Sequence, residues 1–351
     1  MTYTTSSPHP STTSPAPAVT GRVSVVICAY TEDRFDDLLA GCAALGRQSR
    51  VPDEVVLVSD HNDALAARAS REIPGVRVVP NTGQRGLSGA RNCGVAASTG
   101  DVVLFLDDDA EPDEDWVRAS ATAFDDPDVV GVGGWAEPSW DAPGRPGWFP
   151  EAFLWVVGCS YEGLPAHGAR IRNPIGAAMG FRRHDVLAAD GFTSGIGRVG
   201  KHPVGCEETE LSIRVQRQAT TPSARIELRR DATVHHRVRS DRQNLRYFAR
   251  RCFWEGYSKA VVAAAVGAGD ALSSERSYTS RVLPASVGRG MARALRGDLA
   301  GAGQAGAVVL GFSATAAGYA YGLVARGSAV VPATPERAVT GESAHLFGEV
   351  A

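Results

Sequence analysis

Three consecutive aspartates, Asp107, Asp108 and Asp109, follow directly after the apolar run 102–106. Adjacent carboxylates repel one another, so a compensating positive charge is expected where three of them end a buried strand. A hard divalent cation prefers oxygen ligands and would supply that charge. A solvated acidic turn before a helix, with Asp113 as its cap, is the alternative that the triplet alone leaves open.

A second acidic pair, Glu207 and Glu208, lies in the stretch 205–218, where the spacing of Glu207, Leu211 and Arg214 suits a helix. At the start of a helix the dipole favours an ionised carboxylate. A general base must be ionised to accept a proton. The pair therefore suits a catalytic base, and an ordinary acidic first helical turn is the alternative.

Apolar runs rich in β-branched residues predict strands, and helix-like stretches separate them. The strand-like runs are 22–30, 54–60, 76–80, 101–109 and 129–134, and the helix-like stretches are 35–47, 62–72, 87–98 and 113–124. Continuous apolar strands indicate burial on both faces. Alternation of strands with helices predicts an α/β fold with a parallel sheet built from βαβ units.

Polar side chains follow three of these strands. The first strand leads to Tyr30 and Glu32, the second to Asp60, and the fourth to the aspartate triplet. Because ligands bind beyond the carboxyl ends of parallel strands, we expect these side chains to share one edge of the sheet.

Composition excludes some functions and suggests a setting. The 351 residues are 44% hydrophobic and carry a formal charge of −3, so the basic excess of a non-specific nucleic-acid-binding protein is missing. The six cysteines lack the spacing of a zinc site, and without a secretory signal a reduced, cytoplasmic setting is favoured over a disulfide framework. The Ser-, Thr- and Pro-rich stretch 1–20 is expected to be a disordered tail.

The C-terminal third reads as helical. We expect a main domain over 21–240, a helical extension over 241–335 that associates with a membrane, and a flexible tail over 336–351. The stretch 299–325 has no charged residue and is long enough to span ~30 Å of hydrocarbon. Arginines precede it at 289, 293 and 296, which favours the cytoplasmic face of a membrane. A buried or dimer-forming helix pair is the alternative.

The chain from about 22 to 240 resembles a family 2 glycosyltransferase with the GT-A fold, a Rossmann-like, mostly parallel sheet with flanking helices. The stretches that carry the resemblance are "SVVICAYTEDR", "DEVVLVSDHN", "GLSGARNCGVAASTGDVVLFLDDD", "GAAMGFRR" and "GCEETELSIR". They occur in the family's order and spacing. The resemblance implies an inverting, metal-dependent transfer of a sugar from a nucleoside diphosphate to a hydroxyl group.

The resemblance also implies roles for individual residues. Asp109 would ligate Mg²⁺ or Mn²⁺, Asp107 would contact the ribose or share the metal, and His236 rather than His235 would reach the metal or diphosphate. Glu208 would be the base, although the family commonly has aspartate at this position, so Glu207 stays a candidate. Nucleotide contacts would come from the tips of the first strands and the start of a following helix, namely Tyr30, Glu32, Asp60, Arg91 and Asn92.

Further stretches resemble a subgroup described as glucosyl-dolichyl-phosphate glucuronosyltransferases. They are "VICAYTEDR", "DHN", "WFP", "WVVGC", "GRVGKHPVGCEETEL" and "RYFARRCFWEGYSKA". This resemblance implies a UDP-linked donor, UDP-glucuronate, and a glycan or polyprenyl-phosphate-linked acceptor. Arg172, Arg182 and Lys201 are basic candidates for binding a donor carboxylate.

Two other functions compete with this interpretation. A sugar-phosphate nucleotidyltransferase also uses a parallel sheet and metal carboxylates, but it needs a Gly-rich basic loop where this chain has 30–33, "YTED". A non-catalytic sugar-nucleotide-binding protein would not need both the metal aspartates and Glu208. A Rossmann dehydrogenase is disfavoured because no GxGxxG motif follows the first strand.

Overall fold

The computed structural model describes residues 21–197, 205–267, 269 and 275–325. The expected tails over 1–20 and 336–351 lie outside the described residues, as does the stretch 326–335 at the end of the expected helical extension.

The N-terminal half of the sheet is parallel, as predicted. Its strands are β1 (Val23–Ala29), β2 (Glu54–Ser59), β3 (Arg77–Pro80) and β4 (Val102–Asp107), in the spatial order β3-β2-β1-β4. Each pair of neighbours in this order is parallel, so the carboxyl ends of these strands meet at one edge of the sheet.

The C-terminal half of the sheet pairs mainly antiparallel, so the prediction of a mostly parallel sheet holds only for the first half. Here β8 (Ala178–Arg182) is antiparallel to β4 and to β6 (Val129–Trp140), and β9 (Arg225–Val238) is parallel to β6. The short strands β5 (Ala110–Pro112) and β7 (Arg170–Ile171) are antiparallel to β9. Parallel neighbours need a crossover, and no α-helix separates β6 from β8.

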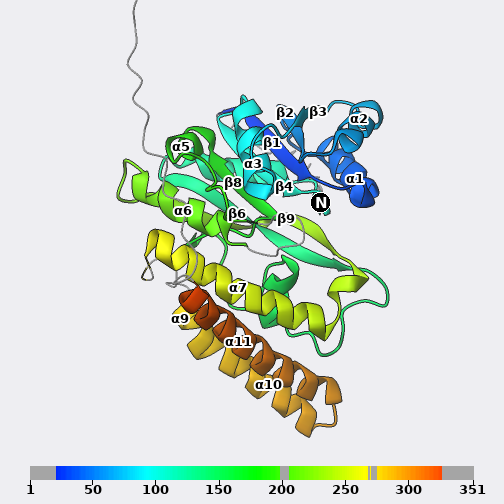
Figure 1. The fold of residues 1–351 in the computed structure, drawn as a ribbon, viewed down its shortest axis with the longest axis vertical. Coiled ribbons are helices and arrows are strands. Elements are labelled where there is room, and N and C mark those ends of the chain that lie inside the picture. Colours follow the sequence, from blue (N-terminus) through cyan, green and yellow to red (C-terminus); the bar gives the residue numbers. More distant parts are fainter. Residues whose placement is uncertain (1–20, 198–204, 268, 270–274, 326–351) are drawn as a thin grey trace, which may run out of the picture.

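Helices cover both faces of the sheet (Figure 1). They are α1 (Phe35–Leu45), α2 (Asp63–Glu72), α3 (Leu87–Ala97), α4 (Trp116–Thr122), α5 (Arg183–Ala188) and α6 (Glu207–Gln218), with short turns η1 (Glu32–Arg34), η2 (Ala123–Asp125), η3 (Glu151–Val157) and η4 (Ser240–Arg242). Alternate residues of one strand enter different cores: Ile27 packs with α1 and α4, and Val26 packs with α3. The predicted burial on both faces is therefore confirmed for β1, β2 and β4, whereas the edge strand β3 has no buried residue.

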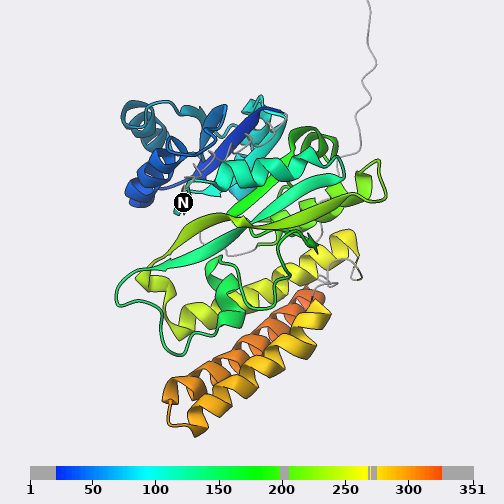
Figure 2. The ribbon, with the colours of Figure 1, turned by 180° about the vertical axis from the view of Figure 1, so that it is seen from behind.

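The C-terminal region is helical, as expected. Helix α7 (Leu245–Val266) lies beneath the sheet, and α10 (Leu283–Leu295) and α11 (Leu299–Ala325) form a hairpin beside it, preceded by α9 (Glu275–Ser277) and η5 (Tyr278–Val282) (Figures 1 and 2). Glycines allow the backbones of α7 and α11 to touch. A Cβ atom on Gly318 would lie 1.8 Å from the carbonyl oxygen of Phe253, and one on Gly256 would lie 1.9 Å from that of Thr315.

Helix α11 presents an apolar face to the outside of the molecule. Its exposed large apolar side chains are Leu299, Val309, Leu310, Phe312, Tyr321, Leu323 and Val324. The helix is long and apolar enough to cross a membrane, by length and composition alone, and only 28% of its most apolar window is buried. The sequence left a buried or dimer-forming helix pair as the alternative. Helix α11 does pack against α7 and α10, but its outer face is exposed.

Candidate active site

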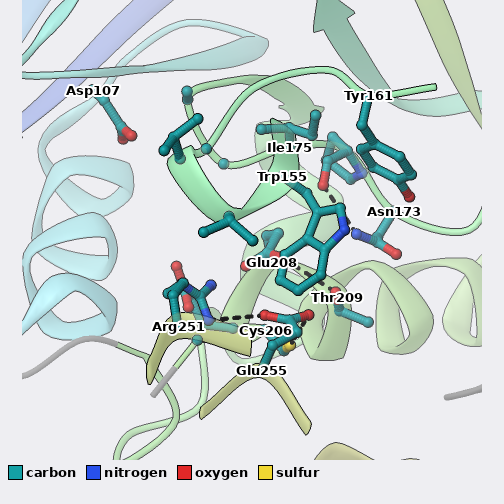
Figure 3. Close-up of a pocket in the computed structure, with 18 of the residues that line it drawn as sticks. Asp107, Trp155, Tyr161, Asn173, Ile175, Cys206, Glu208, Thr209, Arg251 and Glu255 are labelled. Atoms are coloured by element: carbon teal, nitrogen blue, oxygen red, sulfur yellow. Dashed lines mark hydrogen bonds and ion pairs between the residues drawn. The ribbon is translucent and has the colours of Figure 1, made fainter. Parts of the chain in front are cut away.

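One cavity of about 820 Å³ connects the strand tips with the C-terminal helices. Its lining includes Asp107, Asp108 and Asp109 at the end of β4 and Glu207 and Glu208 at the start of α6. These two acidic groups lie about 100 residues apart in the chain, as their numbers show. Figure 3 shows Glu208 and Asp107 facing this space from different elements.

Asp107, Asp109 and His236 form a group whose candidate ligand atoms all lie within 4.8 Å of one another. His236 Nε2, on β9, lies 3.1 Å from Asp109 Oδ1 and 3.8 Å from Asp107 Oδ2. The neighbouring His235 is exposed and lies 2.9 Å from Asp113 Oδ1. The expected alternation of the two histidines is confirmed, because β9 points only His236 into the cavity.

Cys159 and Gly158 pack against the imidazole of His236. The Sγ atom of Cys159 lies 3.9 Å from His236 Nδ1. A Cβ atom on Gly158 would lie 3.2 Å from His236 Cε1, and this glycine has a left-handed φ of 80°. The close approach leaves Nε2 as the nitrogen that faces the aspartates.

Two arginines balance the charge of the aspartates. Arg34 Nη1 lies 2.7 Å from Asp108 Oδ1 and 3.1 Å from Asp109 Oδ2, and Arg242 Nη2 lies 3.4 Å from the same Asp109 oxygen. Burial alone would raise the pKa of Asp109, but His236 and both arginines hold it well below its ordinary value. Burial likewise opposes the charged form of His236, yet the Asp109 carboxylate raises the pKa of this imidazole well above its usual range.

Asp108 differs from its neighbours. Burial raises its pKa to about 7 despite the contact with Arg34. Its second carboxylate oxygen, Oδ2, is buried and has no hydrogen-bond partner among the described residues. The surroundings of Asp108 therefore disfavour its ionised form. Asp107 differs, because 32% of its side chain is exposed and it faces the open cavity.

The structure separates the roles that Glu207 and Glu208 can have. The carboxylate of Glu207 is buried against Arg91, with Arg91 Nη1 2.7 Å from Glu207 Oε1. Arg91 Nη2 also lies 3.7 Å from Asp107 Oδ1. Glu208 faces the cavity and, among the described residues, accepts a hydrogen bond from Thr209 Oγ1 at 3.3 Å. Of the two carboxylates, that of Glu208 is the more exposed, whereas that of Glu207 is paired with Arg91.

The surroundings of Glu208 oppose the ionised form that the start of a helix was expected to favour. The acidic pair does begin helix α6, immediately after Cys206, whose φ of 69° lies in the left-handed region. Burial and the neighbouring Glu207 carboxylate nevertheless raise the pKa of Glu208 to about 8. Desolvation and like-charge repulsion therefore outweigh the helix dipole.

Three of the five expected nucleotide-contacting residues line the cavity: Tyr30, Asp60 and Arg91. Tyr30 is about half exposed at the tip of β1. Asp60 accepts hydrogen bonds from the backbone N–H of Gly86 at 2.9 Å and from Asn81 Nδ2 at 2.7 Å. Asp60 thus braces the loop before α3 as well as facing the cavity.

Glu32 and Asn92 are absent from the cavity lining among the described residues. Glu32 points outward, with Arg68 Nη1 3.8 Å from Glu32 Oε2. Asn92 accepts from the backbone N–H of Phe192 at 2.7 Å and donates to its carbonyl oxygen at 2.8 Å. The structure therefore gives Asn92 a role in fixing the turn at Phe192.

The three basic residues that were candidates for binding a donor carboxylate differ in their position relative to the cavity. Arg172 lines the cavity. The guanidinium of Arg182 donates to the backbone oxygens of Phe124, Asp126 and Val129, on another part of the sheet. Lys201 lies outside the described residues.

Sequence reasoning missed several lining residues. Arg34 ends the stretch "YTEDR", so its place beside the first strand tip was a usable signal. Trp155 and Arg251 lie in the stretches "WVVGC" and "RYFARRCFWEGYSKA", which carried the subgroup resemblance but suggested no role for either residue. Arg242 lies in no such stretch, and the fold brings all three residues to the cavity.

Comparison with known proteins agrees with this arrangement. Residues 24–186 match Glycosyl transferase family 2. A relative from Haloferax volcanii, named glucosyl-dolichyl phosphate glucuronosyltransferase, is 34% identical over 245 residues, which cover 69% of this chain and 77% of the relative. The solved structure of the mannosyltransferase PcManGT from Pyrobaculum calidifontis in complex with GDP-Man and Mn²⁺ is similar in fold, with a TM-score of 0.55 and 17% identity over 88% of this chain and 89% of that one. The chain thus belongs to glycosyl transferase family 2, and it is a glycosyltransferase with the GT-A fold.

Proposed function

We propose that this enzyme transfers a sugar from a nucleoside diphosphate to a hydroxyl group of a lipid-linked or other glycan acceptor. The observation that carries the proposal is that one cavity is lined both by the group Asp107, Asp109 and His236 and by Glu208. Its volume of about 820 Å³ is within the ~300–1,000 Å³ typical of small-ligand sites.

Asp107, Asp109 and His236 are the residues that would hold Mg²⁺ or Mn²⁺. Two carboxylates and an imidazole suit such a cation, and the partly exposed Asp107 leaves the cavity side open to donor oxygens. When bound, the cation stabilises the negative charge that develops on the departing diphosphate. Arg34 and Arg242 add fixed positive charge behind the aspartates.

Glu208 is the proposed general base. The neighbouring Glu207 is buried and forms an ion pair with Arg91. The acceptor oxygen forms a bond to the anomeric carbon while the bond from that carbon to the diphosphate oxygen breaks. The electron pair leaves with the diphosphate, and the hydroxyl proton passes to Glu208. A single displacement inverts the anomeric configuration. NMR of the product tests this step, and a product with the donor's configuration would overturn it.

Tyr30 and Asp60, at the tips of β1 and β2, are the proposed contacts for the base and ribose of the nucleotide. For the donor sugar we propose glucuronate carried on UDP, and for the acceptor a sugar linked through phosphate to a polyprenyl lipid. The name of the Haloferax volcanii relative supports both assignments.

A screen of sugar nucleotides for metal-dependent hydrolysis and transfer tests the proposed activity. We expect UDP-glucuronate to be preferred and free nucleoside diphosphate to be released. Release of pyrophosphate would favour a nucleotidyltransferase instead. Binding of a donor without any turnover would favour a non-catalytic sugar-nucleotide-binding protein.

We also propose that the α10–α11 hairpin attaches the protein to the cytoplasmic face of a membrane. The exposed apolar face of α11 and the arginines at 289, 293 and 296 support this location. Flotation with vesicles that contain anionic lipid tests it. Protein that stays in the dense fraction, with and without vesicles, would contradict the attachment.

A further inference from the structure

A second group of charged side chains lines the same cavity beyond Glu208. Arg251, Glu255 and Lys259 lie on helix α7, and Glu275 lies on α9. Arg172 directly follows β7. Figure 3 shows Arg251 and Glu255 grouped with Glu208 in the lower part of the view, with Asp107 apart from them at the upper left.

These side chains form a row of alternating charge. Arg251 Nη1 lies 3.0 Å from Glu255 Oε2, and Lys259 Nζ lies 3.6 Å from Glu255 Oε1. Lys259 also contacts Glu275, whose other oxygen lies 2.9 Å from Arg172 Nη1. Among the described residues the row contains three cations and two carboxylates.

Both acids are held in the ionised form. Burial opposes ionisation of Glu275, but Lys259 and Arg172 lower its pKa to about 2. Burial likewise opposes ionisation of Glu255, and Arg251 and Lys259 lower its pKa. Charged groups in a partly dry cavity interact strongly with one another and with a charged ligand.

Arg251 ends the row and also interacts with the Glu208 carboxylate. Its Nη1 atom is shielded from solvent and makes no hydrogen bond to any described residue, in spite of the ion pair with Glu255. Gly205 leaves room beside the guanidinium, because a Cβ atom there would lie 3.3 Å from Arg251 Nη2. A planar guanidinium with unused donors is suited to the oxygens of a phosphate group.

The wall next to this row is apolar and comes from α11. Phe312, Thr315, Ala316 and Tyr319 all line the cavity. Phe312 is also 49% exposed on the apolar face of α11. The cavity therefore joins a cationic group near Glu208 to a surface that suits a hydrocarbon chain.

We propose that Arg251, supported by Lys259 and Arg172, binds the phosphate that joins the acceptor's sugar to its lipid. The inference rests on the proposed function, since it names the acceptor of that reaction as a phosphate-linked one. The acceptor sugar then lies at Glu208, and the lipid chain leaves along α11 past Phe312.

The test compares two acceptors that differ only in the phosphate: a glucosyl phosphate ester of a short prenol, and the prenyl glucoside without phosphate. Wild-type enzyme is expected to prefer the phosphate ester. Arg251→Gln should reduce that preference, measured as a ratio of kcat/KM values, by roughly 10–100-fold, as expected for the loss of a charged hydrogen bond. Arg251→Lys should recover part of it.

The matched control is Arg250→Gln, since Arg250 is the exposed neighbour on the same helix. This variant should keep the wild-type preference. If Arg251→Gln melts too low to assay, Lys259→Gln tests the same row, and it should reduce the preference in the same direction.

An unchanged preference in the Arg251→Gln variant would overturn the inference. A raised KM for the donor with an unchanged preference would assign Arg251 to the donor's carboxylate instead. Failure of every sugar nucleotide to support transfer, in wild-type enzyme with either acceptor, would defeat the proposed function rather than this inference.

Discussion

Arg91 and Glu207 form a buried ion pair, with 2.7 Å between Nη1 and Oε1, that ties α3 to the start of α6. The same guanidinium lies 3.7 Å from Asp107 Oδ1, so one side chain connects the two acidic groups of the cavity. The ring of Phe192 lies beneath it, 5.4 Å from the guanidinium carbon. Arg91 is thus built to position other residues, with little of its surface left for a ligand.

Replacement of Arg91 by methionine should therefore affect both stability and the pH profile. It leaves the Glu207 carboxylate buried and unpaired, which costs about 3–5 kcal/mol of folding free energy. Because Arg91 lowers the pKa of Glu208, its loss should also move the alkaline rise of kcat/KM to higher pH. Denaturant unfolding and a pH series measure the two effects. Arg71→Met, at an exposed position on α2, is the control. An unshifted pH profile would reduce Arg91 to a purely structural role.

The raised pKa of Glu208 predicts an enzyme that is more active at alkaline pH. Its charged surroundings are Glu207, Arg91, Glu255 and Arg251, and burial with Glu207 dominates, giving a pKa of about 8. At pH 7 roughly one tenth of the free enzyme then has the ionised base. We expect kcat/KM to rise by roughly tenfold per pH unit below pH 7 and to level off above pH 8. A flat profile from pH 6 to pH 9 would contradict this assignment.

Glu208→Gln should abolish transfer without unfolding the protein. Loss of a general base typically costs about 10²–10⁴-fold in rate. Since the fold raises the pKa of Glu208, ionisation of this residue opposes folding as pH rises from the unfolded value towards 8. The Tm of Glu208→Gln at pH 8 should therefore not fall.

The control for Glu208→Gln is Glu210→Gln on the same helix. Glu210 is buried and hydrogen bonded to Arg214 and Thr193. Its replacement should lower the Tm and spare the activity per folded molecule. Equal losses of activity in the two variants would mean that Glu208 matters only for the fold.

The adjacent histidines give a matched test of the metal group. His236→Asn should weaken Mn²⁺ binding by at least roughly tenfold, an effect that even a residue that only orients a ligand can produce. His235→Asn should leave Mn²⁺ binding unchanged, because His235 is exposed and contacts Asp113 instead. Electron paramagnetic resonance titration of Mn²⁺ measures both variants. Equal affinities would remove His236 from the metal site.

Replacing glycine by alanine is expected to have opposite effects on stability at two positions of α11. Gly318→Ala would place a Cβ atom 1.8 Å from the carbonyl oxygen of Phe253, so α7 and α11 must separate, at a cost of about 1–3 kcal/mol or more. Gly306→Ala meets nothing within 4 Å and should stabilise the helix by up to about 1 kcal/mol. Thermal unfolding in one detergent compares them. Equal Tm values would show that the backbones are not in close contact.

The sequence predicted the parallel half of the sheet well, because β1 to β4 are continuous β-branched runs separated by amphipathic helices. It missed the continuation of β6 to Trp140 and the turn η3, since the segment rich in Trp, Pro and Gly shows no period of 2 or 3.6. Its aromatic side chains pack by shape against α7 and α11, and no local pattern records those partners.

The candidate site likewise contains residues that the sequence indicated and residues that only the fold brings together. Asp107, Asp109 and Glu208 belong to short motifs at strand and helix ends, so their types and order were informative. The pairing of Glu207 with Arg91 and the row from Arg251 to Arg172 depend on long-range packing, which the sequence does not display. The burial that raises the pKa of Glu208 also depends on tertiary packing, whereas the helix dipole that the sequence indicated is a local effect.

Phe312 belongs both to the cavity lining and to the outward apolar face of α11. A detergent that coats this face therefore competes for the entrance that we assign to the acceptor's hydrocarbon chain. An apparent affinity measured in micelles will reflect the surfactant as well as the enzyme, and nanodiscs of defined lipid content remove that competitor.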